Sequence, residues 1–295
     1  MLNFSEITPA DIPVLREYLA YDDSGFCDYT CGVVFTWKDA LNLQFALQGD
    51  RLFLKNGFQD RTRFYMPCGP GSIQDAAAEI IEYCALQKIP MRFVALSEQH
   101  VQQLSSFLKL EDAPVRDYAD YVYSAQQLLS LSGKALHPKR TQLAGFSRKY
   151  PTWRYLPLIP EHMDRVLRFF EEFCRQVPAE SASEITERAC TLSALSHFHE
   201  LPFLGGFLEV SGKVAAFTIA EQKGDTLYVH VEKADRCFEG SYTVINHAFV
   251  EDCMQKMSIQ WVNREDDAGD AGLRRAKLSW KPDHLLEKRI AGVKK

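Results

Sequence analysis

The same five-part pattern occurs twice in this chain of 295 residues and constrains its fold more than any other feature. In each copy a β-prone run leads into a glycine-bearing loop, a serine, an apolar helical stripe and a second short β-prone run. The loop glycine precedes the aromatic residue of the second run by 22 residues in one copy (Gly71 to Phe93) and by 21 in the other (Gly240 to Trp261). Two matching orders of elements predict two related half-domains.

In the second copy, the alternating run Thr226–Val231 predicts a strand, and Ser241 has the position of an N-cap for the helix that follows. The first N–H groups of a helix lack intrahelical partners, and the helix dipole favours negative charge there. The pattern therefore predicts a phosphate-binding site with Arg236, Gly240 and Ser241 as its contacts. The alternative is an ordinary connection between a strand and a helix.

Both copies fit an α/β (α+β) protein with mixed sheets flanked by helices. We expect an N-terminal half over residues 1–132 and a C-terminal half over residues 133–295 that carries the site. The aromatic, β-prone run Val115–Ser124 is interpreted as the strand that closes the first half.

Composition excludes few functions. The chain is 46% hydrophobic and 25% charged with a net charge of −5, so nothing global demands nucleic acid or a membrane. The eight cysteines form no C-x-x-C pair, and the spacing of Cys27 and Cys31 has no second ligand pair, so we expect no metal site. Their apolar neighbours and the lack of a signal peptide or a run of about 18 apolar residues indicate a cytoplasmic protein.

One local run is strongly basic. Lys134–Tyr150 contains five Lys or Arg residues and no acid. Lys139 and Arg140 suit phosphate contacts, so this run could bind tRNA or another polyanion. A solvated helix face is the alternative.

A densely polar segment, Asn263–Lys281, follows the β-prone Trp261-Val262, at the end of a strand where ligands gather. Asp270 has the position of a cap for a short helix. The remaining polar residues either pair with one another or contact a ligand: cationic residues would bind an anionic donor or acceptor, and acidic ones an amine. The candidates are Asn263, Arg264, Glu265, Asp267, Arg274 and Lys277.

Two segments resemble one known family. They are Tyr121-Val122-Tyr123 with the residues that follow it to Tyr150-Pro151, and Asn263-Arg264-Glu265-Asp266-Asp267 with the residues that follow it to Lys281-Pro282. Both are similar to the C-terminal-domain family of phosphatidylglycerol lysyltransferases, and the resemblance covers essentially the whole chain. It implies two tandem GNAT-like domains related to the Fem-type peptidyltransferases, which use aminoacyl-tRNA. It also implies aminoacyl transfer to a lipid or to another amine or hydroxyl acceptor.

Acyl transfer needs a polarised carbonyl, a neutral nucleophile and a stabilised leaving group. In a GNAT-like frame the central strands splay, here near Tyr228–Glu232, and His230 or Glu232 could serve as the base. Glu265 is a third catalytic candidate. Alternatively, Tyr228, His230 and Glu232 form one face of a half-buried strand.

The sequence thus predicts an acyltransferase of the aminoacyl-transfer type that uses aminoacyl-tRNA or a similar phosphate-bearing donor. One alternative is an acetyl-CoA-dependent N-acetyltransferase with acyl-CoA as co-substrate; another is a catalytically silent module that binds a nucleotide, tRNA or an acidic partner. The GNAT pyrophosphate loop, Gln/Arg-x-x-Gly-x-Gly/Ala, is not reproduced at Arg236–Tyr242, which has one extra residue before its glycine. This departure favours aminoacyl transfer and the silent module over CoA chemistry.

Overall fold

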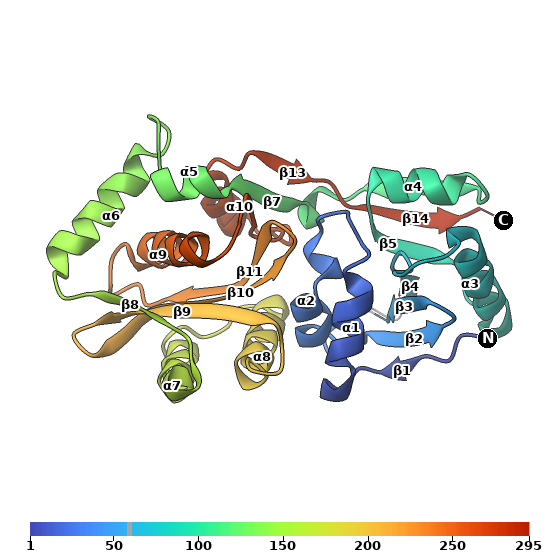
Figure 1. Ribbon diagram of the computed structural model, residues 1–295, viewed down its shortest axis with the longest axis horizontal. Coiled ribbons are helices and arrows are strands. Elements are labelled where there is room, and N and C mark those ends of the chain that lie inside the picture. Colours follow the sequence, from blue (N-terminus) through green and yellow to red (C-terminus); the bar gives the residue numbers. More distant parts are fainter. Residues whose placement is uncertain (58–60, 295) are drawn as a thin grey trace. The chain divides into compact units, whose positions relative to one another are not determined.

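The computed structural model describes residues 1–57 and 61–294 (Figure 1). The chain forms two compact units. Unit 1 contains Met1–Asp120, Asp266–Gly269 and the chain from Leu286 onward, and unit 2 contains Tyr121–Glu265 and Asp270–Leu285. A division into two domains at residue 132 remains a prediction. Each unit is built on one mixed sheet flanked by helices, as the α/β (α+β) prediction requires.

Unit 1 has the strand order β1-β2-β3-β4-β5-β14-β6. β4 and β5 are parallel, with Phe64 opposite Phe93, and the late strand β14 lies between β5 and β6, antiparallel to both. The strands are β1 (Ser5–Glu6), β2 (Gln44–Gln48), β3 (Arg51–Asn56), β4 (Arg63–Phe64), β5 (Arg92–Leu96), β6 (Leu110–Pro114) and β14 (Arg289–Val293). The helices are η1 (Pro9–Asp11), α1 (Ile12–Leu19), η2 (Cys27–Tyr29), α2 (Cys31–Thr36), α3 (Ile73–Gln87), α4 (Glu98–Ser105) and η4 (Arg116–Tyr118).

Helix α3 follows a serine cap, as the first copy of the pattern predicts. The Ser72 hydroxyl accepts a hydrogen bond from the backbone N–H of Asp75 at 3.2 Å, which satisfies a donor with no intrahelical partner. The helix buries Ala76, Ile80 and Cys84 and ends at Lys88, which adopts a left-handed conformation.

Unit 2 has the strand order β13-β7-β12-β11-β10-β9-β8. Its strands are β7 (Asp120–Ser124), β8 (Arg154–Pro157), β9 (Phe203–Val210), β10 (Lys213–Lys223), β11 (Thr226–Ala234), β12 (Trp261–Asn263) and β13 (His284–Leu286). Its helices are α5 (Ala125–Ser130), α6 (His137–Lys149), α7 (Pro160–Gln176), α8 (Ala182–Ser196), α9 (Ser241–Lys256) and α10 (Ala271–Leu278). The strand expected to close the first half is instead β7, and it pairs with β12 in this second sheet, with Tyr123 opposite Val262.

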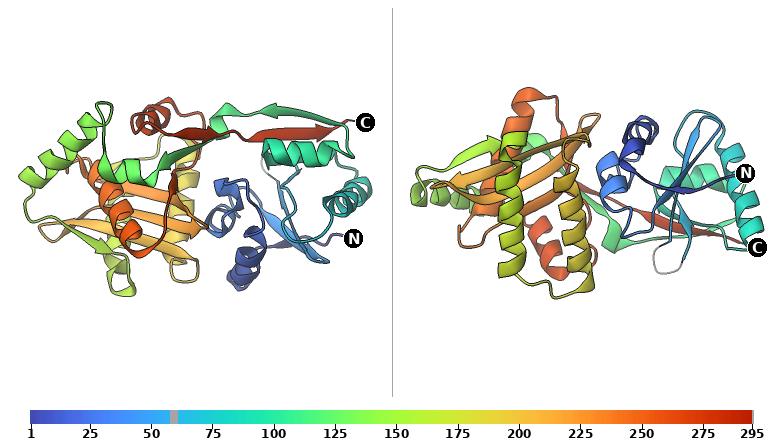
Figure 2. Two further views of the ribbon diagram at one scale, coloured as in Figure 1. Left: turned by 45° about the horizontal axis from the view of Figure 1, so that its top comes forward. Right: turned by 90° about the horizontal axis from the view of Figure 1, so that it is seen from below.

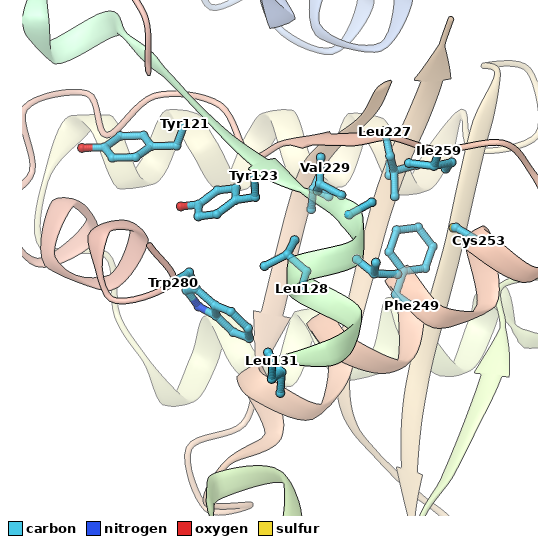
Figure 3. Packing of buried hydrophobic residues seen from close by; sticks show 14 of the residues in the cluster. Tyr121, Tyr123, Leu128, Leu131, Leu227, Val229, Phe249, Cys253, Ile259 and Trp280 are labelled. Carbon is cyan, nitrogen blue, oxygen red and sulfur yellow. The ribbon is translucent and has the colours of Figure 1, made fainter. Parts of the chain in front are cut away.

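Helices cover both faces of the second sheet, with α9 on one face and α7 and α8 on the other (Figures 1 and 2). Under α9 lies a core to which β7, α5, β11 and α9 contribute buried side chains, among them Tyr123, Leu128, Val229 and Phe249 (Figure 3). Burial of this apolar surface packs α9, α5 and β7 against the sheet.

A β-bulge interrupts β11 at His230. Ile219 of β10 lies opposite Val231, and the next residue, Ala220, lies opposite Val229, so His230 is skipped. The extra residue breaks the alternation of side chains. The alternative in which His230 and Glu232 form one face of the strand is therefore wrong, and their side chains enter different clusters.

Within the described parts of the chain, no helix is both long enough and apolar enough to cross a bilayer.

Candidate functional site

β11 and β12 separate where the polar residues gather. Their parallel pairing ends at Tyr228 opposite Asn263. Beyond this point the chain turns toward β7, since the backbone N–H of Arg264 donates to the Tyr121 carbonyl at 2.9 Å. The splay predicted for a GNAT-like frame is present, and Arg264 lies at its opening.

Arg264 is the centre of a largely buried cluster. Its Nη2 lies 3.0 Å from Glu232 Oε1, and Glu232 Oε2 accepts a hydrogen bond from Asn246 Nδ2 of α9 at 3.2 Å. Its guanidinium carbon lies 5.8 Å from the centre of the Tyr123 ring and 5.3 Å from that of Trp280, both drawn in Figure 3. These five residues, together with Lys139, are called the Arg264 cluster below.

Lys139 reaches the cluster from α6. Its Nζ lies 4.3 Å from the centre of the Trp280 ring, a cation–π contact. Burial and the nearby charge of Arg264 lower the pKa of the Lys139 ammonium to about 8, against the opposing carboxylate of Glu232. The Lys139 ammonium group therefore loses its proton only slightly above neutral pH.

Two buried polar atoms of the cluster have no hydrogen-bond partner among the described residues: Arg264 Nη1 and Asn246 Oδ1. Buried polar atoms are nearly always hydrogen-bonded. Arg264 Nη1 is a hydrogen-bond donor, and Asn246 Oδ1 is an acceptor. A ligand that offers an acceptor to Arg264 and a donor to Asn246 would satisfy both.

Lys277 and Asp270 fix the local backbone. Lys277, buried on α10, donates from Nζ to the Arg264 carbonyl, and Tyr123 donates its hydroxyl to the Lys277 carbonyl at 2.9 Å. Asp270 caps α10 through the N–H of Leu273, as predicted. Lys277 thus positions Arg264, while Arg274, also on α10, is partly buried.

His230 and Glu265 belong to a second polar group. His230 Nδ1 lies 2.8 Å from Glu265 Oε1, and its Nε2 lies 3.4 Å from Glu221 Oε2. Burial disfavours the imidazolium, but the hydrogen bond to Glu265 and the nearby carboxylate of Glu221 outweigh it and raise the pKa of His230 to about 9. At neutral pH His230 already holds its proton, so it is poorly suited to the role of general base that the sequence suggested.

Asn263 orients this second group. It is fully buried, and its Oδ1 accepts a hydrogen bond from the Glu265 N–H at 2.7 Å. This bond closes a tight backbone turn in which Glu265 has a φ of 58°. Asn263 therefore shapes the turn that separates the side chains of Arg264 and Glu265.

The start of α9 differs from the predicted anion site. Gly240, with a φ of 90°, is the N-cap, and Ser241 is the first helical residue, so the predicted serine cap is wrong. The Ser241 hydroxyl instead donates to the Asp235 carbonyl at 3.2 Å. Arg236 is exposed in the preceding turn.

Helix α6 packs against this end of α9. A Cβ atom added to Gly240 would lie 3.5 Å from the Gln142 carbonyl oxygen and 3.7 Å from the Phe146 side chain. The Thr243 hydroxyl donates to Gln142 Oε1 at 2.7 Å. The helix terminus that was expected to receive a donor phosphate is therefore packed against a neighbouring helix.

The basic run divides into residues with different partners. Arg140 donates from Nη1 to the carbonyls of Leu131 and Gly133, so it ties α6 to the preceding loop. Lys149 pairs with Glu239 at 3.5 Å. Of the two predicted phosphate contacts, only Lys139 enters the Arg264 cluster.

Asp267 lies in unit 1. Its side chain is fully buried, with Oδ2 3.3 Å from Arg116 Nη1, and its Oδ1 accepts a hydrogen bond from the Gly269 N–H at 3.0 Å. The structure thus gives Asp267 a cation as partner, where the sequence suggested an amine ligand.

A further polar group in unit 1 surrounds Lys288. The side chains of Cys27, Asp28 and Asp120 are close enough to share a metal ion. The Lys288 Nζ lies 2.7 Å from Asp120 Oδ1 and 3.3 Å from Cys27 Sγ, and it pairs with Asp28. The Lys288 ammonium group therefore already supplies the positive charge that these ligands would otherwise receive from a metal ion.

Sequence reasoning missed Glu221, Asn246, Tyr123 and Trp280. Asn246 interrupts the apolar stripe of the α9 helix, and a polar residue in such a stripe is the only local signal that would have found it. Tyr123 and Trp280 are ordinary core aromatics by sequence, and only the fold brings them to Arg264.

Two mixed sheets, each flanked by helices, with a splayed pair of central strands define the class of tandem GNAT-like folds. Residues 22–291 match the family model described as phosphatidylglycerol lysyltransferase, C-terminal, and the chain belongs to this family.

Three solved structures share the fold. A conserved protein of unknown function from Bacteroides thetaiotaomicron is 31% identical, with all of both chains covered and a TM-score of 0.92. L-PGS from Bacillus licheniformis is 11% identical over 98% of this chain and 93% of that one, with a TM-score of 0.66. FemX is 8% identical over 99% of this chain and 97% of its own, also with a TM-score of 0.66.

Among curated proteins, the uncharacterised protein MYCGA3080 of Mycoplasmoides gallisepticum is 21% identical over 182 residues. The match covers 59% of this chain and 56% of that protein, so the chain spans little more than half the length of this relative.

Proposed function

We propose that this chain is an acyltransferase that moves an aminoacyl group from aminoacyl-tRNA, or from a similar phosphate-bearing donor, to an amine or hydroxyl acceptor. Family membership and a fold like those of L-PGS and FemX support the reaction class. The Arg264 cluster, with its two orphaned buried atoms, is the observation that carries the proposal.

The cluster suits an aminoacyl ester. Arg264 Nη1 and Lys139 Nζ can donate to the carbonyl oxygen or to a neighbouring phosphate, where negative charge develops in the transition state. Asn246 Oδ1 and the carboxylate of Glu232 can accept from the α-ammonium group. A donor with a carbonyl beside an ammonium thus meets a complementary group at each end.

The transfer requires a proton to move. The acceptor oxygen or nitrogen attacks the ester carbonyl, the bond from the carbonyl carbon to the ribose oxygen breaks, and that oxygen must gain a proton. Lys139, with a pKa of about 8, can donate this proton and then take one from the acceptor, because a catalytic pKa near the operating pH is the most effective.

The test is an assay with tRNA carrying radiolabelled aminoacyl groups, with phosphatidylglycerol vesicles and a soluble primary amine as separate acceptors. We expect label to leave the tRNA and enter one acceptor. Lys139→Gln should slow transfer by roughly a hundredfold, and the loss of rate above pH 8 should disappear in this variant. Lys213→Gln, at an exposed position outside both the basic run and the cluster, is the control and should transfer at the wild-type rate.

If the protein transfers acetyl groups from acetyl-CoA and no label leaves the tRNA, the proposal is wrong and the protein is an N-acetyltransferase. The packing of α6 against the start of α9 weighs against this outcome. Full activity of Lys139→Gln would refute the role of the cluster, and absence of any transfer by the folded wild type would favour a silent binding module.

A further inference from the structure

We propose that unit 1 contains a second ligand site, which binds the oxyanion of a small metabolite, a carboxylate or a phosphate, at the start of α3. A cavity of about 190 Å³ opens there, with room for about six water molecules. Its walls come from the loop before α3, from α4 and from the segment after α1, and include Asp22, Arg51, Gly69, Ile73, Gln99 and His100.

Arg51 carries the inference. It is only 7% exposed, and its Nη1 and Nη2 donate to the neutral carbonyls of Pro67 and Gly71. Its Nε is buried with no hydrogen-bond partner, and no carboxylate of the described residues forms an ion pair with it. A buried cation without a counter-ion is costly, and a bound anion would supply both the charge and the missing acceptor.

The start of α3 adds a second attraction for an anion. This helix has 15 residues, and the pocket contacts its first residue, Ile73. The N–H groups of a first turn lack intrahelical partners, and the helix dipole is positive at this end. A helix start alone would indicate little, but here Arg51, whose Nε has no hydrogen-bond partner, lines the same cavity.

The loop before α3 keeps this end accessible. Gly69 has a φ of 132°, and a Cβ there would lie 2.3 Å from the Asp50 carbonyl oxygen, so a larger residue does not fit. A Cβ on Gly71 would lie 3.8 Å from Arg51 Nε. Glycine at this position therefore leaves the approach to the Nε without a side chain.

Two acidic residues, Asp22 and Asp23, also line the cavity. Asp22 Oδ2 lies 3.2 Å from His100 Nε2, Asp22 Oδ1 accepts from the Ser24 hydroxyl, and Asp23 is exposed. These groups would repel a ligand that is anionic throughout. The ligand that fits has its oxyanion at Arg51 and a hydroxyl or ammonium group at the other end.

The experiment follows the Arg51 Nε–H resonance of the full chain during titration with inorganic phosphate and, separately, with acetate at matched ionic strength. We expect a saturable shift with at least one of the two, and the better probe distinguishes a phosphate from a carboxylate. Sodium chloride is the control for ionic strength. A shift that does not saturate, or that chloride reproduces in full, would overturn the proposal.

Two matched variants locate the site. Ile73→Glu places a carboxylate at the cavity wall, and an acid in a first helical turn does not destabilise the helix. It should weaken binding by at least about tenfold through charge repulsion. Ile81→Glu puts the same residue at an exposed position of the same helix and should bind as the wild type does. Equal affinity in both variants would contradict the assignment, and neither result bears on aminoacyl transfer by the Arg264 cluster.

Discussion

The two copies of the repeated pattern share a topology but differ in what surrounds their helix starts. β4 and β5 flank α3 as a parallel pair in unit 1, and β11 and β12 flank α9 in the same way in unit 2. The start of α3 is capped by Ser72 and opens on a cavity, whereas the start of α9 is capped by Gly240 and packs against α6. A topology repeated in sequence therefore does not guarantee that the same ligand position remains open.

Each unit has an arginine that is largely buried, and the partners of the two arginines differ. Arg51 lies at the start of α3 with neutral carbonyls as its only described acceptors, while Arg264 follows β12 and pairs with Glu232. This arginine has a different place in each unit: near the helix start in unit 1 and at the splay of the strands in unit 2.

The largest expected effect comes from removing Arg264. Arg264→Met leaves the Glu232 side chain, only 11% exposed, without its cation, and should lower the free energy of unfolding by about 3–5 kcal/mol. Arg51→Met should cost less, because it leaves no carboxylate unpaired. Chemical denaturation of both variants measures the difference. A double variant, Arg264→Met with Glu232→Gln, should recover part of the loss, and equal costs for the two arginines would break the comparison.

Opening the start of α9 should have the next largest effect. Phe146 is 1% exposed and packs beside Gly240. Phe146→Ala should cost about 3 kcal/mol, because α6 can close only part of the cavity that forms. The same variant should bind inorganic phosphate at α9 if packing alone hides this helix start. Thermal unfolding measures the stability of this variant. Unchanged stability would show that Phe146 does not hold α6 against the start of α9.

The bulge in β11 gives unit 2 a pH dependence of its own. The folded pKa of His230, about 9, lies above the ordinary value of 6.5, so its contribution to stability is complete below pH 6.5 and is lost as the pH rises through 9. Between these values the free energy of unfolding should fall by about 1.4 kcal/mol per pH unit through this group. Denaturation of His230→Gln alongside the wild type over this pH range isolates the contribution of His230 to stability. Parallel pH profiles of the two proteins would show that His230 makes no such contribution.

A smaller effect is expected at the helix start itself. Gly240→Ala forces a residue with a side chain into a left-handed conformation and should cost about 1–2 kcal/mol. Gly145→Ala is the control within α6, where an added methyl group meets no other atom within 4 Å. It should stabilise the protein by about 0.5–1 kcal/mol. If both variants shift the melting temperature in the same direction, the left-handed conformation of Gly240 does not account for its effect.

Local patterns predicted the elements well. The alternation in Thr226–Val231, the apolar stripe after Gly240 and the cap at Ser72 each depend on residues a few positions apart, and each element formed. The family resemblance rested on two segments and is confirmed. The bulge at His230 was not predictable, because it depends on the register of β10 against β11.

The sequence by itself determined the repeated order of elements, the α/β class and the family, because these follow from local periodicity and from motifs. Only the tertiary structure decided which charges meet. Glu232, Asn246, Lys139 and Trp280 come from four separate parts of the chain and surround Arg264 because packing under α9 brings them together. The same packing covered one predicted anion site, since the neighbours of a helix start are set by contacts distant in sequence.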